Sequence, residues 1–507
     1  MSVKRFGMLA AVCVAAVGGL DAAARAEEPA AAAKGRYRVA WAAYLGGDAW
    51  NQAREAMPLA DGSVLVGAQS CSAQMPTTAG VVQPKYAGDD PNLGHGGIYG
   101  GDCFLARLSG DAGRVLAATY FGGSKQERNV YGLALDRQGN VVITSATRSP
   151  DVPTTPGCFQ PKYGGPPADW LVAKLSADFK KVVWCTYVGG AGDEFPRGGL
   201  AVDGEDRVYV VGNSASANFP TTPGAFQREL KGKGDAAIAK LKADGSGLLW
   251  STRLGGAADE GIMGVRVDGG GNVYVAGHTT SADFPVTAGA PQGKLGGKSD
   301  CWLAKLSADG AMLIYSTFLG GAADEFAEHR LNLLADGSVL LTGVSGSADF
   351  PTTAGAAQRQ LKGKTDGFLT KLSPDGKRWE FSTLLGGSGG EFFLMPTLDS
   401  QENILVVGQT DSRDFPVTAD ALQTRYGGGT SDGVMAILSS DGSKLLYASY
   451  LGGSGEDMIR SLAVGSDGAV YLVGNTASED FPVPADASGR KPAGKGDAYV
   501  VKLVPNR

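Results

Sequence analysis

Short hydrophobic runs separated by polar turns recur along the whole chain. In one representative interval, residues 198–203 (GGLAVD) form a short apolar run, and residues 207–212 (RVYVVG) alternate as a half-buried strand should. Two further strand-like runs follow at residues 235–241 (DAAIAKL) and 247–254 (GLLWSTRL), the second rich in aromatic side chains. Apolar periodicity of helical length is absent. The pattern predicts four short antiparallel strands joined by tight turns.

The same four runs repeat seven times. A hydrophobic residue followed by two glycines recurs at spacings of 76, 67, 66, 65, 66 and 66 residues, and an aspartate that opens a short apolar run keeps the same spacing. The first glycines of the pairs are Gly46, Gly122, Gly189, Gly255, Gly320, Gly386 and Gly452. The aspartates are Asp102, Asp169, Asp235, Asp300, Asp366, Asp432 and Asp497. Four strands in a period of this length describe one blade of a β-propeller.

The two ends of the repeat region complement each other. Residues 37–45 resemble the outer strand of a blade, and residues 497–503 resemble the third strand. The last blade therefore lacks an outer strand, which residues 37–45 can supply, closing the ring and leaving no open edge. We predict an all-β fold, a seven-bladed β-propeller with four antiparallel strands per blade, closed by the N-terminal strand.

Several segments resemble the SBBP (seven-bladed β-propeller) repeat family of bacterial exported proteins. They are residues 313–321 (LIYSTFLGG), 272–277 (NVYVAG), 283–287 (DFPVT) and 223–227 (PGAFQ). The resemblance covers residues 37–503 and implies the propeller fold. It implies no activity, because the family has no uniform catalytic motif and a fold does not determine function.

The first 26 residues have the features of an export signal: a basic start, an apolar run and an Ala-x-Ala cleavage site at residues 24–26. The apolar run is too short to span a bilayer. We expect a signal peptide at 1–26, a short Ala-rich linker at 27–36 and a single propeller at 37–507. The expected blades cover residues 48–123, 124–190, 191–256, 257–321, 322–387, 388–453, and 454–507 together with 37–47. The protein is expected to be exported to the periplasm, the cell surface or the medium.

Charge and cysteine content narrow the candidate partners. Without the first 26 residues the chain has 43 basic and 51 acidic residues, a net charge of −8, which disfavours nucleic acid and anionic membranes as partners.

Five cysteines remain, an odd number, and a role as small buried residues explains them better than a disulfide framework. If a bridge forms, it joins Cys71 to Cys103 or Cys158 to Cys185. We expect a monomer without membrane insertion.

Acidic residues follow most of the glycine pairs, in the connections that lead to the inner strands. Such connections lie near the axis on one face of a propeller, so their carboxylates could hold Ca²⁺ or receive a basic or hydroxyl-rich ligand. We favour the alternative that these acidic residues belong to solvated turns and accept hydrogen bonds from their own backbone. The candidates are Glu127, Asp193, Glu194, Asp259, Glu260, Asp324, Glu325, Glu391, Glu456 and Asp457.

The first blade carries about 11 extra residues between its second and third strands. They fall around residues 87–101 and bring Asp89, Asp90, His95 and Tyr99 to the same face as the acidic connections. These four residues are further candidates for ligand binding. A tolerated surface insertion is the alternative, because lengthening a loop costs little stability.

Catalytic groups are sparse. The chain has three histidines, His95, His278 and His329, each in a different repeat, and no metal cluster or Ser-His-Asp arrangement can be recognised by spacing. We therefore expect a non-catalytic module without a cofactor that binds a protein, a glycan or cell-envelope material. A polysaccharide hydrolase or lyase that uses the acidic residues as acid and base is the second hypothesis. A structural surface module stabilised by a cation such as Ca²⁺ is the third.

Overall fold

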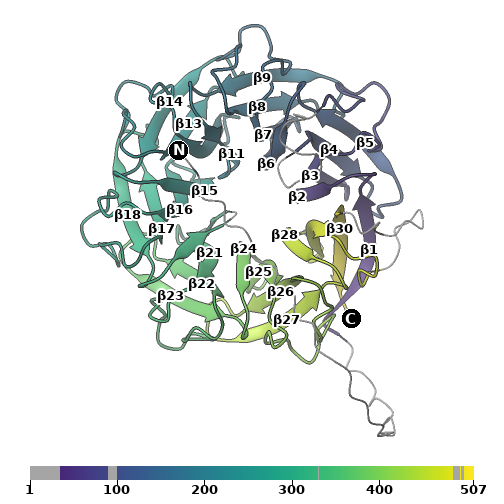
Figure 1. Cartoon of the computed structure of the whole chain (residues 1–507), viewed down its shortest axis with the longest axis vertical. Coiled ribbons are helices and arrows are strands. Elements are labelled where there is room, and N and C mark those ends of the chain that lie inside the picture. The colour runs from purple at the N-terminus through teal and green to yellow at the C-terminus, as the bar shows by residue number, and fades with distance from the viewer. Residues whose placement is uncertain (1–34, 89–99, 329, 484–491, 493–495, 507) are drawn as a thin grey trace, which may run out of the picture.

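The computed structural model describes residues 35–88, 100–328, 330–483, 492 and 496–506. These residues form 30 strands in seven antiparallel sheets arranged around an axis (Figure 1). The first two blades consist of β2 (Asn51–Pro58), β3 (Val64–Ser70), β4 (Asp102–Leu108) and β5 (Val115–Phe121), then β6 (Glu127–Leu135), β7 (Val141–Thr147), β8 (Asp169–Leu175) and β9 (Val182–Val188).

Blades 3 to 5 follow in the same order, but the inner strand is split in blades 3 and 5. Their strands are β10 (Glu194–Phe195), β11 (Leu200–Val202), β12 (Val208–Ser214), β13 (Asp235–Leu241) and β14 (Leu248–Leu254); β15 (Glu260–Val267), β16 (Val273–Thr279), β17 (Asp300–Leu306) and β18 (Leu313–Leu319); β19 (Glu325–Ala327), β20 (Asn332–Leu333), β21 (Val339–Ser345), β22 (Asp366–Leu372) and β23 (Trp379–Leu385).

Blades 6 and 7 complete the ring. Their strands are β24 (Glu391–Leu398), β25 (Ile404–Thr410), β26 (Asp432–Leu438) and β27 (Leu445–Leu451), then β28 (Asp457–Val464), β29 (Val470–Thr476), β30 (Asp497–Pro505) and β1 (Tyr37–Leu45). The predicted closure is confirmed, because β1 pairs antiparallel with β30 and places Tyr44 opposite Tyr499. In Figure 1 the purple β1 lies beside the yellow β30 at the rim of the ring.

Aromatic side chains on several outer strands join a blade to the next one. The Trp184 indole of β9 donates a hydrogen bond to the Ala243 carbonyl (3.0 Å), in the turn that precedes β14. Its ring lies against Gly245, where a Cβ atom would approach within 2.6 Å. Gly245 also has φ +69°, which favours glycine. The recurring Asp-Gly turns are therefore both tight turns and docking points for the preceding blade.

The cysteines of the described segments are all free, and neither of the two candidate bridges forms. Cys103, Cys185 and Cys301 are buried, as expected of small core residues. No helix among the described residues is long and apolar enough to cross a bilayer.

Candidate functional site

The acidic residues expected in the connections belong to two different environments. Six of them are the first residues of inner strands, with side chains that are almost completely buried. Each connection from an outer strand to the next inner strand is thus shorter than the sequence pattern indicated. Its last acidic residue is already part of the inner strand. These six are Glu127, Glu194, Glu260, Glu325, Glu391 and Asp457.

Each buried acid is held in a hydrogen-bond network that includes the glycine pair and the recurring aspartate. Between blades 3 and 4, the Gln227 amide donates to Asp235 (2.6 Å) and accepts from the backbone N–H of Gly255 (3.1 Å). The N–H of Gly256 donates to Glu260 (3.1 Å), which also accepts from a threonine hydroxyl of β16 (2.7 Å). A Cβ atom at Gly255 would lie 2.4 Å from Glu260, so only glycine fits there. The two sequence markers are parts of one structural unit.

Burial opposes the ionisation of five of these carboxyls, those of Glu127, Glu260, Glu325, Glu391 and Asp457. It raises the pKa of Glu127 to about 7, although hydrogen bonds from Ser149, Thr147 and Gly123 act in the opposite direction. Burial also raises the pKa of Glu260 and Glu391. Carboxyls that are enclosed and bonded to their own blade are poorly placed to contact a ligand, so their ligand-binding role stays a prediction.

The remaining acidic candidates precede the buried ones and are more accessible. Asp193, Asp259 and Glu456 are exposed, and Asp324 is half-buried. Each makes an isolated parallel bridge to the residue before the third strand of the preceding blade. No group of three or more His, Cys, Asp and Glu side chains gathers in a metal-binding arrangement within the described part of the chain.

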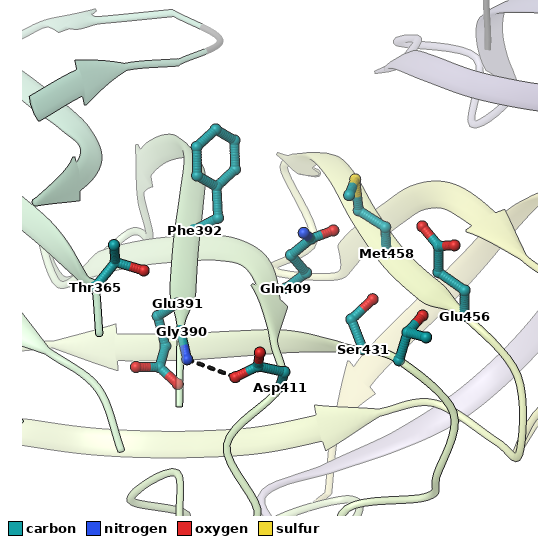
Figure 2. Close-up of a pocket in the computed structure, with 10 residues that line it drawn as sticks. Thr365, Gly390, Glu391, Phe392, Gln409, Asp411, Ser431, Glu456 and Met458 are labelled. Carbon is teal, nitrogen blue, oxygen red and sulfur yellow. Dashed lines mark hydrogen bonds between the residues drawn. The ribbon is translucent and has the colours of Figure 1, made fainter. Parts of the chain in front are cut away.

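One connection departs from this pattern and opens a pocket. Blade 6 has Gly390 where blades 3 to 5 have aspartate, and the space beside it is a cavity of about 420 Å³ (Figure 2). Thr365 stands at one end and Glu456 at the other, so the pocket extends from blade 5 across blade 6 to blade 7. A Cβ atom at Gly390 would lie 3.0 Å from the Thr365 hydroxyl. The missing side chain therefore contributes to the opening.

The pocket combines an acidic rim with apolar side chains. Asp411 and Glu456 are exposed, and Asp411 accepts a hydrogen bond from the Gly390 N–H. Phe392 is half-buried and Met458 is 6% exposed. The remaining side chains of the lining are Thr365, Glu391, Gln409, Thr430 and Ser431, which supply hydroxyl, amide and carboxyl groups. This chemistry suits a cationic or hydroxyl-rich group that also presents an apolar surface.

Of the predicted residues, Glu391 and Glu456 are brought together by this pocket. Asp89, Asp90, His95 and Tyr99 lie outside the described residues, as does His329. The sequence analysis did not predict this pocket. The signal was Gly390, because in the other five blades with a buried acid the residue before that acid is acidic or polar.

Within the described residues the histidine is His278, which lies within β16 and not in a loop. Burial lowers its pKa to about 4, and its ring contacts the Phe326 ring edge-on at 5.1 Å between centroids. It fills the space beside Gly261, where a Cβ atom would lie 2.4 Å from the imidazole. These contacts explain His278 as a packing residue.

No protein-family model matches the chain, and no curated protein does. Among solved structures, the chain is similar to BamB from Moraxella catarrhalis, with 14% identity and a TM-score of 0.39 over 92% of this chain and 99% of that one. It is also similar to a europium-containing methanol dehydrogenase (12% identity, TM-score 0.40, 93% and 94% covered). A third similar structure is the quinohemoprotein alcohol dehydrogenase of Comamonas testosteroni, with 11% identity and a TM-score of 0.43 over 92% of this chain and 76% of that one. Likenesses this distant carry no inference about function.

Proposed function

We propose that the chain is an exported, non-catalytic propeller of the SBBP-repeat type that binds protein, glycan or cell-envelope material on its loop face. The observation that supports this is the pocket beside Gly390, the place where the repeat is interrupted on that face. A binding module needs such an exposed, chemically mixed depression, whereas the repeated buried acids already have a structural role.

The acidic rim suggests which ligand groups enter. A lysine or arginine side chain of a protein, or an amino sugar of a glycan, would place its cation near Glu456 and its carbon skeleton near Phe392 and Met458. The hydrolase or lyase hypothesis is less well supported. The two glutamates that it would use first, Glu194 and Glu260, are buried and bonded within their blades.

The test uses a lysine-rich peptide and an array of bacterial envelope glycans as probes, with affinity measured by titration calorimetry. Glu456→Gln removes one rim charge without changing size, and Gly390→Leu fills the pocket. We expect each to weaken binding at least about fivefold, the effect of losing one charged contact of roughly 1 kcal/mol. Glu229→Gln is the matched control, because Glu229 is exposed in a connection on the same face but outside the pocket.

Two outcomes would contradict the proposal. One is that no probe binds. The other is that binding is insensitive to both pocket variants. Turnover of a polysaccharide that is lost in Glu194→Gln or Glu260→Gln would favour the enzyme hypothesis instead.

A further inference from the structure

The inner strands place a group of arginines around the propeller axis. Arg54, Arg197, Glu328 and Arg460 each stand three residues after the first residue of an inner strand, in blades 1, 3, 5 and 7. They therefore lie at the same level along the axis. The other three blades have apolar residues at this level, Val130, Met263 and Leu394.

Two ion pairs join side chains of non-adjacent blades across the axis. Arg197 of blade 3 pairs with Glu328 of blade 5 (2.6 Å), and Arg330 of blade 5 pairs with Glu55 of blade 1 (2.7 Å). Non-adjacent blades are thus joined through their side chains. Arg266 of blade 4 lies within electrostatic range of both Arg330 and Glu55.

The cations outnumber the anions here. Five arginines (Arg54, Arg197, Arg266, Arg330 and Arg460) lie near three glutamates, Glu55, Glu328 and, acting on Arg460, Glu456. Among the described residues this leaves two excess positive charges, in a chain whose net charge is −6. Among the described residues, neither Arg54 nor Arg460 has a carboxylate at ion-pair distance. A concentration of like charge in a partly buried place is costly unless an opposite charge is present.

Arg54 shows most clearly that a partner is missing. Its side chain is 5% exposed, and its Nε and one Nη atom are buried with no hydrogen-bond acceptor among the described residues. The guanidinium stacks on the Tyr131 ring, 4.6 Å from the centroid, which fixes its plane. Burial, with the charges of Arg460 and Arg197, lowers the pKa of Arg54. Since arginine keeps its proton in proteins, this cost is relieved by an added anion.

Arg460 is oriented toward the same place. Its Nε and Nη2 lie 3.1 and 2.9 Å from one atom of the Gln52 side-chain amide and donate to that atom when it is the amide oxygen. Gln52 is two residues from Arg54 on β2, so the amide holds the two guanidiniums on neighbouring blades close to each other. Planar guanidiniums with fixed orientation match the oxygens of a carboxylate or phosphate.

We propose that Arg54 and Arg460, with Arg197 beside them, form an anion site at the propeller axis that takes an oxyanion, a carboxylate or a phosphate group. This site uses other side chains than the acidic pocket of the loop face, although the pocket's Glu456 acts electrostatically on Arg460. Its ligand has the opposite charge, so the arginine variants test this site and the pocket variants test the proposed binding function.

The test measures binding of inorganic phosphate and of citrate to the full chain by titration calorimetry, at constant ionic strength set with sodium chloride. We expect saturable binding to at least one probe and a matching rise in melting temperature. The probe that binds more tightly distinguishes a phosphate from a carboxylate ligand. Arg54→Gln should weaken binding at least tenfold. Arg378→Gln should leave it unchanged, because Arg378 is an exposed arginine paired with Glu380.

Arg54→Lys is the second variant in case the glutamine does not fold. It keeps the charge but loses the planar pair of donors, so weaker binding is again expected. The proposal is overturned if neither probe binds more strongly than chloride. It is equally overturned if affinity is the same in the wild type, the Arg54 variants and Arg460→Gln.

Discussion

Glu127 allows a sharp test of the buried carboxyl network. Its side chain is fully buried, accepts hydrogen bonds from the Gly123 N–H (3.0 Å) and the Thr147 hydroxyl (2.7 Å), and has its pKa raised by burial from 4.5 to about 7. The folded state therefore binds the proton more tightly than the unfolded state. This contribution to stability is fully present below pH 4.5 and is lost as pH rises through 7.

The magnitude follows from the shift. A difference of about 2.5 pKa units corresponds to roughly 3 kcal/mol, of which about 2 to 3 kcal/mol is lost between pH 5 and pH 8. Glu127→Gln has nearly the same shape but does not titrate. The wild type should therefore lose about this much stability relative to the variant over the same range.

Denaturant unfolding of the two proteins at pH 5, 6, 7 and 8 measures the difference directly. Comparing the two proteins at each pH is necessary because burial also raises the pKa of Asp169 and Asp432 to about 7, and these groups titrate in both proteins. The exposed Glu229→Gln is the control and should show a constant difference. A constant difference for Glu127→Gln, or one that favours the wild type more as pH rises, would refute the reasoning.

Three further predictions concern other parts of the ring. His278 has its pKa lowered to about 4, so it stabilises the fold above pH 6.5 and loses this contribution as pH falls. In denaturant unfolding, the stability of His278→Asn relative to wild type should therefore rise by about 2 kcal/mol from pH 7.5 to pH 5. In the same assay, Trp302→Phe should lower the free energy of unfolding by about 1 kcal/mol more than Trp170→Phe does. Both indoles are fully buried, but among the described residues only Trp302 has an acceptor, the His278 carbonyl at 3.0 Å. Equal losses of unfolding free energy for the two variants would contradict this. Ala42→Pro interrupts the closing strand and should cost about 2 kcal/mol or more in thermal unfolding, whereas Arg38→Ala, at an exposed position of that strand, should be nearly neutral.

The blade count and the closure of the ring could be predicted because each repeat carries markers with a strict geometric role. A glycine is required wherever a Cβ would meet Glu260 or Asp235, and the same constraint recurs in other blades. The third strand of blade 3, expected at residues 235–241, spans β13 with the same bounds. The glycine pairs and the aspartates could be recognised in the sequence because the contact that requires them recurs from blade to blade.

The inner strands were less predictable. In blade 3 the expected strand at 198–203 corresponds to β11, but the segment at Glu194 was missed. The register shifts within the inner strands, as between Ile262 and Gly264, which breaks the alternation that identifies a strand. An acid that begins such a strand therefore resembles a loop residue until its partners are known.

The repeated and the unique polar residues have different physical meanings in this fold. A polar residue that recurs in most blades, such as Glu260, is bonded to groups that recur with it, so the scaffold itself accounts for its presence. Arg54 stands at a level where blades 2, 4 and 6 have valine, methionine and leucine, so the scaffold does not require a charge at this level. A buried charge that the scaffold does not require and does not pair reduces stability. Positions such as Arg54 and Gly390, where the blades differ from one another, are therefore where ligand binding should be sought first.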